Sequence, residues 1–96
     1  MEKINVALQV LPSGGEKGSY ELVDEAIACI QRSGLTYQVC PFETVIEGTY
    51  DDVMDVVKQA QEACLAAGAE KLMVYMKLQR TKGDNVTIED KMAKYR

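Results

Sequence analysis

Hydrophobic and polar residues alternate along three stretches of the chain, at residues 4–11, 35–47 and 71–79. Such alternation is typical of β-strands that bury one face. Pro41 interrupts the second stretch, and because proline cannot donate a hydrogen bond to a strand ladder, it divides this stretch into two strands joined as a hairpin. The pattern therefore predicts four strands, at 4–11, 35–40, 42–47 and 71–79.

Apolar residues recur three and four positions apart in two other stretches, as they do on the buried face of a helix. We expect the first helix to be capped by Ser19 and to end at Gly34. The second should begin at Thr49, with Asp52 three positions later, and end at Gly68. A short terminal helix, capped by Thr87, should follow. The apolar stripes of the two long helices are Leu22, Val23, Ala26, Ile27 and Ile30, and Val53, Val57, Ala60 and Cys64.

The order βαββαβ predicts an α+β fold, a single ferredoxin-like sandwich over residues 1–96. In this fold a four-stranded antiparallel sheet carries two helices on one face, here with a short C-terminal helix added. The other face stays open and would present a mixture of apolar and polar side chains. A chain of this size leaves much of its surface exposed, so we expect a homo-oligomer that packs sheet on sheet, with a ligand pocket in the seam.

Charge and composition narrow the function. A net charge of −4 argues against nucleic acid as a partner, and no apolar run approaches the roughly 20 residues of a membrane helix. The chain opens without the pattern of a signal peptide, which predicts a cytoplasmic protein. The absence of histidine removes His-based catalytic triads and the usual Cys/His zinc sites, and we expect no cofactor.

The segment at 41–48 is the most suggestive chemically. Strand parity places Phe42, Thr44 and Ile46 toward the core and Glu43 and Glu47 on the other face. A carboxylate at Glu47 could accept hydrogen bonds from the ring N–H or amino group of a nitrogen heterocycle. Alternatively, it charges the N-terminus of the following helix. Glu43 could instead be a solvated partner of a lysine such as Lys77.

Other side chains on the strands could complete such a site. The amides of Gln9 and Gln38 offer donors and acceptors that suit a pyrimidine edge, and Tyr37 and Tyr75 could stack on a ring. In the alternative reading the glutamines are ordinary outward-facing polar residues and the tyrosines pack between subunits.

Several segments together resemble the small bacterial and archaeal thiamine-binding protein family. They are Pro41-x-x-Thr44-x-Ile46-Glu47-Gly48, the preceding Ser33-Gly34-Leu35-x-Tyr37, and the terminal Thr87 to Arg96. The likeness runs over almost the whole chain, from Val6 to Arg96.

The resemblance implies a ferredoxin-like fold, interlocked dimers that pair into tetramers, and binding of thiamine or its hydroxymethylpyrimidine part without established catalysis. By this resemblance Thr44 and Glu47 would lie near the pyrimidine, although parity alone places Thr44 on the core face. Lys77 departs from the family's pattern, and a lysine beside a thiazolium cation would be repulsive.

The ligand-binding candidates are therefore Gln9, Gln38, Thr44, Glu47 and Tyr75, with no catalytic or metal-binding residue. Two other functions stay open. One is a regulatory or protein-interaction module that uses the open face. The other is a small enzyme in which Glu43 and Glu47 carry out acid/base chemistry.

Overall fold

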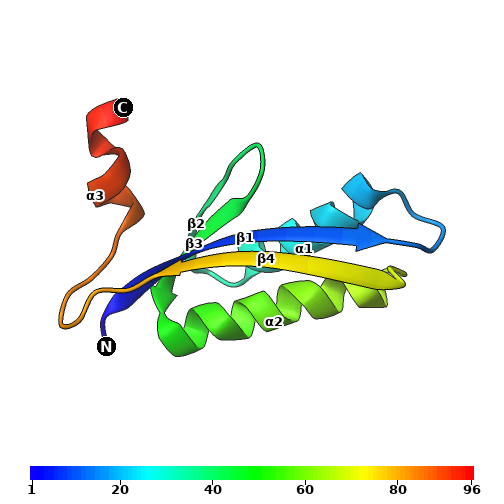
Figure 1. Ribbon diagram of the computed structural model, residues 1–96, viewed down its shortest axis with the longest axis horizontal. Helices are drawn as coiled ribbons and strands as arrows, with labels where there is room; N and C mark the ends of the chain where they lie inside the picture. Colours follow the sequence, from blue (N-terminus) through cyan, green and yellow to red (C-terminus); the bar gives the residue numbers. More distant parts are fainter.

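Four strands and two long helices follow one another in the predicted order βαββαβ in a computed structural model that describes residues 1–96 (Figure 1). A short helix and a single 3-10 turn complete the chain. The elements are β1 (Lys3–Ser13), α1 (Ser19–Arg32), β2 (Thr36–Val39), β3 (Thr44–Thr49), α2 (Tyr50–Ala66), β4 (Lys71–Gln79), α3 (Ile88–Met92) and the 3-10 turn η1 (Ala93–Tyr95).

The strands form one antiparallel sheet in the order β2-β3-β1-β4. The long central strand β1 pairs with β3 through Val6 and Ile46, and with β4 through Val10 and Val74. This order, with each long helix crossing between non-consecutive positions in the sheet, is the ferredoxin-like sandwich that the sequence predicts.

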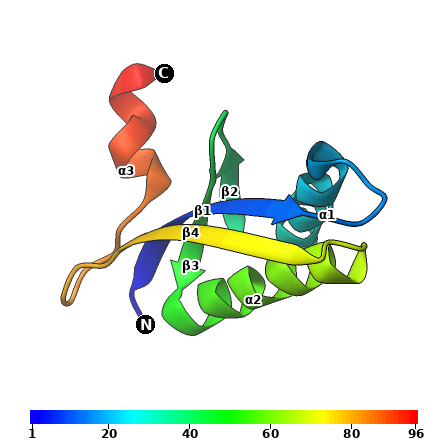
Figure 2. The same cartoon turned by 45° about the vertical axis from the view of Figure 1, so that its right-hand side comes forward.

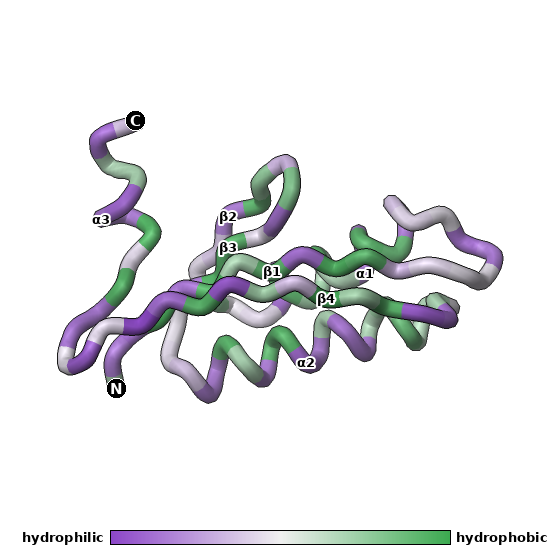
Figure 3. The backbone as a smooth tube through the Cα atoms, viewed as in Figure 1, coloured by the Kyte–Doolittle hydropathy of each residue, from purple (hydrophilic) through white to green (hydrophobic).

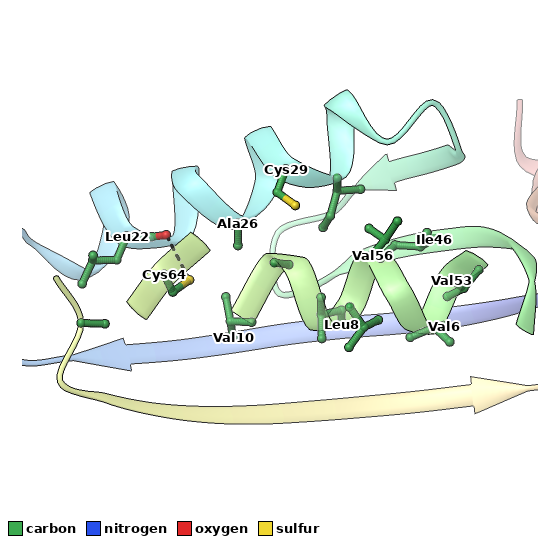
Figure 4. Close-up of a cluster of buried hydrophobic side chains, with 14 of the residues drawn as sticks. Val6, Leu8, Val10, Leu22, Ala26, Cys29, Ile46, Val53, Val56 and Cys64 are labelled. Carbon is green, nitrogen blue, oxygen red and sulfur yellow. Dashed lines mark hydrogen bonds between the residues drawn. The ribbon is translucent and has the colours of Figure 1, made fainter. Parts of the chain in front are cut away.

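Both long helices lie against one face of the sheet, and their stripes close the core with the inward residues of β1 and β3 (Figure 4). In the tube of Figure 3, hydrophobic and hydrophilic residues alternate along α2. Cys64 lies in this core and donates from its thiol to the Leu22 carbonyl at 3.3 Å. Burial raises the pKa of the Cys64 thiol, because removal from water disfavours the thiolate.

The helix starts agree with the sequence in two of three cases. Thr49 accepts from the Asp52 N–H at the start of α2, and Thr87 accepts from the Asp90 N–H at the start of α3. The predicted cap at Ser19 is wrong. Ser19 is the first helical residue, and Gly18 precedes the helix without a side-chain cap.

Phe42 also departs from the prediction, because the hairpin connection is longer than the sequence pattern indicates. β3 begins only at Thr44, and the connection closes with a hydrogen bond from the Cys40 N–H to the Glu43 carbonyl, at 2.9 Å. Phe42 lies in this turn with 82% of its surface exposed, and so does not belong to the core.

The glycine-rich loop between β1 and α1 is held by its own chain. The Gly15 N–H donates to Glu70 Oε1 at 2.9 Å, and Gly15 has a φ of 81°. A carboxylate of the protein thus occupies the loop amide that an external anion would need.

After β4 the chain turns back and joins the start of β1. The Val86 N–H donates to the Lys3 carbonyl, and the Lys3 N–H donates to Asn85 Oδ1. From there α3 rises on the side of the sheet opposite α2 (Figures 1 and 2). No helix of the structure has both the length and the apolar character needed to span a bilayer.

Candidate functional site

A cavity of about 400 Å³ lies between the open face of the sheet and the C-terminal segment. Its size is that of small-molecule pockets. All four strands, the β2–β3 connection and α3 contribute its lining, which mixes apolar side chains with amides and lysines. The lining residues are Asn5, Ala7, Gln38, Cys40, Val45, Lys77, Leu78, Gln79, Ile88, Lys91 and Met92.

The register of the sheet explains why these polar residues meet. Asn5 lies opposite Glu47 on β3 and opposite Gln79 on β4. Residues directly opposite one another in an antiparallel pair point to the same face, so these three side chains form one row across the open face.

The neighbouring row on the same face runs through Ala7. It pairs with Val45 on β3 and Lys77 on β4, and Val45 in turn pairs with Gln38 on β2. Alanine at the centre of this row leaves the space that the cavity occupies, while the lysine and the glutamine stand at its two sides.

Asn5 is fixed in orientation although it lies in an otherwise apolar strand. It is 3% exposed, and its side-chain amide donates to the carbonyls of Ile4 and Val86 at 3.1 and 3.0 Å. Its Oδ1 accepts from Lys91 Nζ at 3.0 Å. Asn5 therefore joins the sheet to the C-terminal segment at two points, the carbonyl of Val86 and the ammonium group of Lys91.

Glu47 carries the other connection to this segment. It is 7% exposed, and its Oε1 accepts from the Ile88 N–H at 2.6 Å. A charge-assisted hydrogen bond of this kind offsets part of the cost of burying a carboxylate. Its effect is to place Ile88 and the following turn as one wall of the cavity.

Gln38 lines the cavity on the side of β2 and is also bound to the last residue of the chain. Gln38 Oε1 accepts from Arg96 Nη2 at 3.3 Å, and Arg96 also pairs with Glu89 at 2.8 Å. Cys40 beside it is half-buried and free. No group of three or more His, Cys, Asp or Glu side chains is placed to hold a metal ion.

The five predicted ligand-binding residues do not converge on one place. Gln38 lines the cavity, and Glu47 lies in the adjacent row with Ile88 against it. Gln9 and Tyr75 are register partners further along the open face, in a neighbouring hollow that also includes Lys77.

Thr44 lies on the other side of the sheet. It pairs with Leu8, whose side chain is in the core, and it is 6% exposed. The structure therefore places Thr44 on the core face, as strand parity predicts. The cavity and Thr44 are separated by the thickness of the sheet.

Sequence reasoning missed Asn5, Lys91 and the apolar pair Ile88 and Met92 as parts of the cavity. Asn5 carried a usable signal, because an amide within an apolar strand must find hydrogen-bond partners. Lys91 and Met92 carried none, since nothing in the sequence indicates that the terminal helix folds back over the sheet.

Comparison with known proteins places this geometry in a family. The family model described as "Thiamine-binding protein" matches residues 6–96. A UPF0045 protein of Clostridium perfringens is 41% identical over 96 residues, which cover 100% of both chains.

Two solved structures are similar over nearly their whole length. A DUF77 protein of unknown function from Bacillus cereus has a TM-score of 0.95 at 40% identity, covering 99% of this chain and 91% of that one. A Thermotoga maritima protein that has been proposed to act in thiamine biosynthesis or salvage has a TM-score of 0.87 at 31% identity, covering 98% and 99%. By the family match and by these relatives, the chain belongs to the thiamine-binding protein family.

Proposed function

We propose that this protein binds thiamine or its hydroxymethylpyrimidine part, without catalysis, in the cavity between the open sheet face and the C-terminal segment. The proposal rests on one observation: a single cavity in a protein of this family is lined by both amide groups and apolar side chains. Three unpaired cysteines fit a reducing compartment, so we place this function in the cytoplasm.

The chemistry of the lining suits an aminopyrimidine. Its ring nitrogens are acceptors and its amino group is a donor, and the amides of Gln38 and Gln79 supply both complementary groups. Ile88, Met92 and Val45 offer apolar surface for the faces of the ring. Glu47 remains our predicted acceptor for the amino group, because it lies opposite Asn5, one of the residues that line the cavity.

We further propose that the protein acts as a dimer, and that dimers pair into a tetramer. Leu11, Met73 and Tyr75 extend the open face beyond the cavity and are between 42% and 56% exposed. Exposed apolar residues on neighbouring strands favour a partner sheet. A second subunit seated there would close the cavity on its open side.

Thermal unfolding with each ligand tests the binding proposal. We expect thiamine or hydroxymethylpyrimidine to raise the melting temperature, because a ligand that binds only the folded state stabilises it. Gln38→Leu should abolish the shift, whereas Gln31→Leu on the exposed surface of α1 should keep it. No shift with either compound in the unmodified protein would contradict the proposal.

The exposed residues Leu11, Met73 and Tyr75 also favour a second function, that of an interaction module for another protein. The two can be distinguished by the state of the protein isolated from cells. Native mass spectrometry of a binding protein would find a homo-oligomer with a retained small molecule, whereas an interaction module would be found with a different protein on the open face.

A further inference from the structure

The charges around the cavity are unlike those of the chain as a whole. The chain has 15 acidic and 11 basic residues, yet the charged residues that line the cavity are both lysines, Lys77 and Lys91. No carboxylate is among the eleven lining residues. In an acidic protein, a lining whose only charged residues are two lysines favours an anion locally.

The ammonium group of Lys91 is held in place by a neutral partner. Its Nζ lies 3.0 Å from Asn5 Oδ1, and Asn5 is itself fixed by the carbonyls of Ile4 and Val86. An amide oxygen orients the ammonium group but does not neutralise it. Lys91 forms no ion pair, since the two ion pairs of the structure are Lys77–Glu43 and Arg96–Glu89. Lys91 therefore keeps a positive charge available to a ligand.

Lys77 is paired, but its partner lies toward the neighbouring hollow. Its Nζ is 3.0 Å from Glu43 Oε1, and its side chain is 79% exposed. Lys77 borders both the cavity and the hollow that contains Glu43. Exposed ion pairs of this kind contribute little, and a lysine side chain is flexible, so the ammonium group can turn to a ligand that carries more charge than one carboxylate.

The two lysines also stand close together along the sheet. Lys77 lies opposite Ala7, and Lys91 is bound to Asn5, two residues earlier on the same face of β1. Two residues of a strand span about 7 Å, which the oxygens of one phosphate and two lysine side chains can bridge. Arg96 lies beyond Gln38, engaged with Glu89.

We propose that the ligand of this cavity carries an anionic group, a phosphate ester, which the ammonium groups of Lys77 and Lys91 bind while the amides and apolar walls hold the body of the molecule. The proposal rests on the proposed function and narrows it, because it selects the phosphorylated pyrimidine or thiamine phosphate over the uncharged alcohol and the thiamine cation. Thiamine itself would bring its positive charge toward two lysines, which costs binding energy.

Titration calorimetry on the full-length protein tests this with matched probes. The probes are hydroxymethylpyrimidine, its monophosphate, thiamine, thiamine monophosphate and inorganic phosphate. We expect each phosphate ester to bind at least about tenfold tighter than its alcohol, as charge-assisted hydrogen bonds to phosphate imply. The advantage should shrink as sodium chloride is raised.

Variants then assign the effect to the two lysines. Lys91→Gln and Lys77→Gln should each reduce the affinity for the phosphate esters about fivefold or more beyond any change in the affinity for the alcohols, as loss of one charged contact implies. Lys58→Gln, an exposed lysine on α2, serves as the control and should change neither affinity.

The outcomes separate this inference from the proposed function. If the alcohols bind as tightly as their phosphates, the anion inference is wrong and the binding function stands. If inorganic phosphate binds through the two lysines but no pyrimidine or thiamine compound binds, the anion site is supported and the proposed function fails. If no probe binds, or if both lysine variants behave as Lys58→Gln does, the anion inference is overturned.

Discussion

The carboxylate of Glu47 accepts a hydrogen bond from the backbone N–H of Ile88 at 2.6 Å, across 41 positions of the chain. This bond joins the sheet to the segment that walls the cavity. Glu47 therefore has a structural role in the free protein, and any part that it plays in ligand binding depends on the same side chain.

We expect Glu47→Ala to destabilise the protein by about 1–3 kcal/mol, because the Ile88 N–H would lose its acceptor in a buried position. Glu47→Gln retains an amide oxygen at this site and should cost less. Chemical denaturation measures both effects, and hydrogen exchange at Ile88 should become faster only in the alanine variant. Equal exchange in the two variants would mean that the bond does not hold the segment.

Self-association through the open face predicts a clear effect of charge at Met73, which is 56% exposed on β4. Met73→Lys should shift the protein toward monomers in analytical ultracentrifugation, because a buried lysine in a sheet-to-sheet interface would lack a partner. Leu65 on α2 is 48% exposed and gives a matched control. A Leu65→Lys variant that dissociates while Met73→Lys does not would place the interface on the helical face.

The raised pKa of Cys64 predicts a loss of stability at alkaline pH. The unfolded chain releases the thiol proton near pH 8.5, whereas the folded protein retains it to higher pH. Stability from this group is therefore complete below the unfolded pKa and falls as pH rises through the folded pKa, by at most about 1.4 kcal/mol per pH unit.

Comparison of variants isolates this contribution. Cys64→Ala should be less stable at neutral pH but should show a shallower decline of unfolding free energy above pH 8.5. Val57→Ala removes apolar volume from the same core without removing a titratable group, and so should shift the curve without changing its slope. Parallel curves for the native protein and Cys64→Ala would contradict the assignment.

We expect alanine substitutions at Gly15 and at Gly18 to differ in their effect on stability. Gly15 has a φ of 81°, and a Cβ there would collide with the Gly68 carbonyl. Gly18 has an ordinary φ of −70° and open space around its Cα. Gly15→Ala should cost at least about 1–2 kcal/mol in denaturant unfolding, and Gly18→Ala should be close to neutral. A neutral Gly15→Ala variant would show that the loop can shift away from Gly68.

The fold could be predicted from the sequence because its signals are local. Strand alternation, the helical stripes and the caps at Thr49 and Thr87 depend on neighbouring residues, and the structure agrees with them. The prediction for Phe42 was wrong because strand parity was extended into the hairpin connection, where β3 has not yet begun. An aromatic residue in such a run looks the same whether it enters the core or lies in the turn.

The cavity could be predicted only in part, since it depends on contacts between the two ends of the chain. Gln38 was identified from its position on a strand, but Lys91 reaches Asn5 across 86 positions. No local pattern reports that contact. Thr44 shows the reverse case, in which strand parity alone predicted the observed face of the sheet.

The attachment of the C-terminal segment has an evolutionary consequence. Ile88, Lys91 and Met92 form one side of the cavity, while the fifteen-residue core cluster contains none of them. Substitutions at Lys91 or Met92 can therefore change what the cavity accepts without disturbing the packing of the core cluster. Relatives with the same sandwich could diverge in ligand preference through their last residues alone.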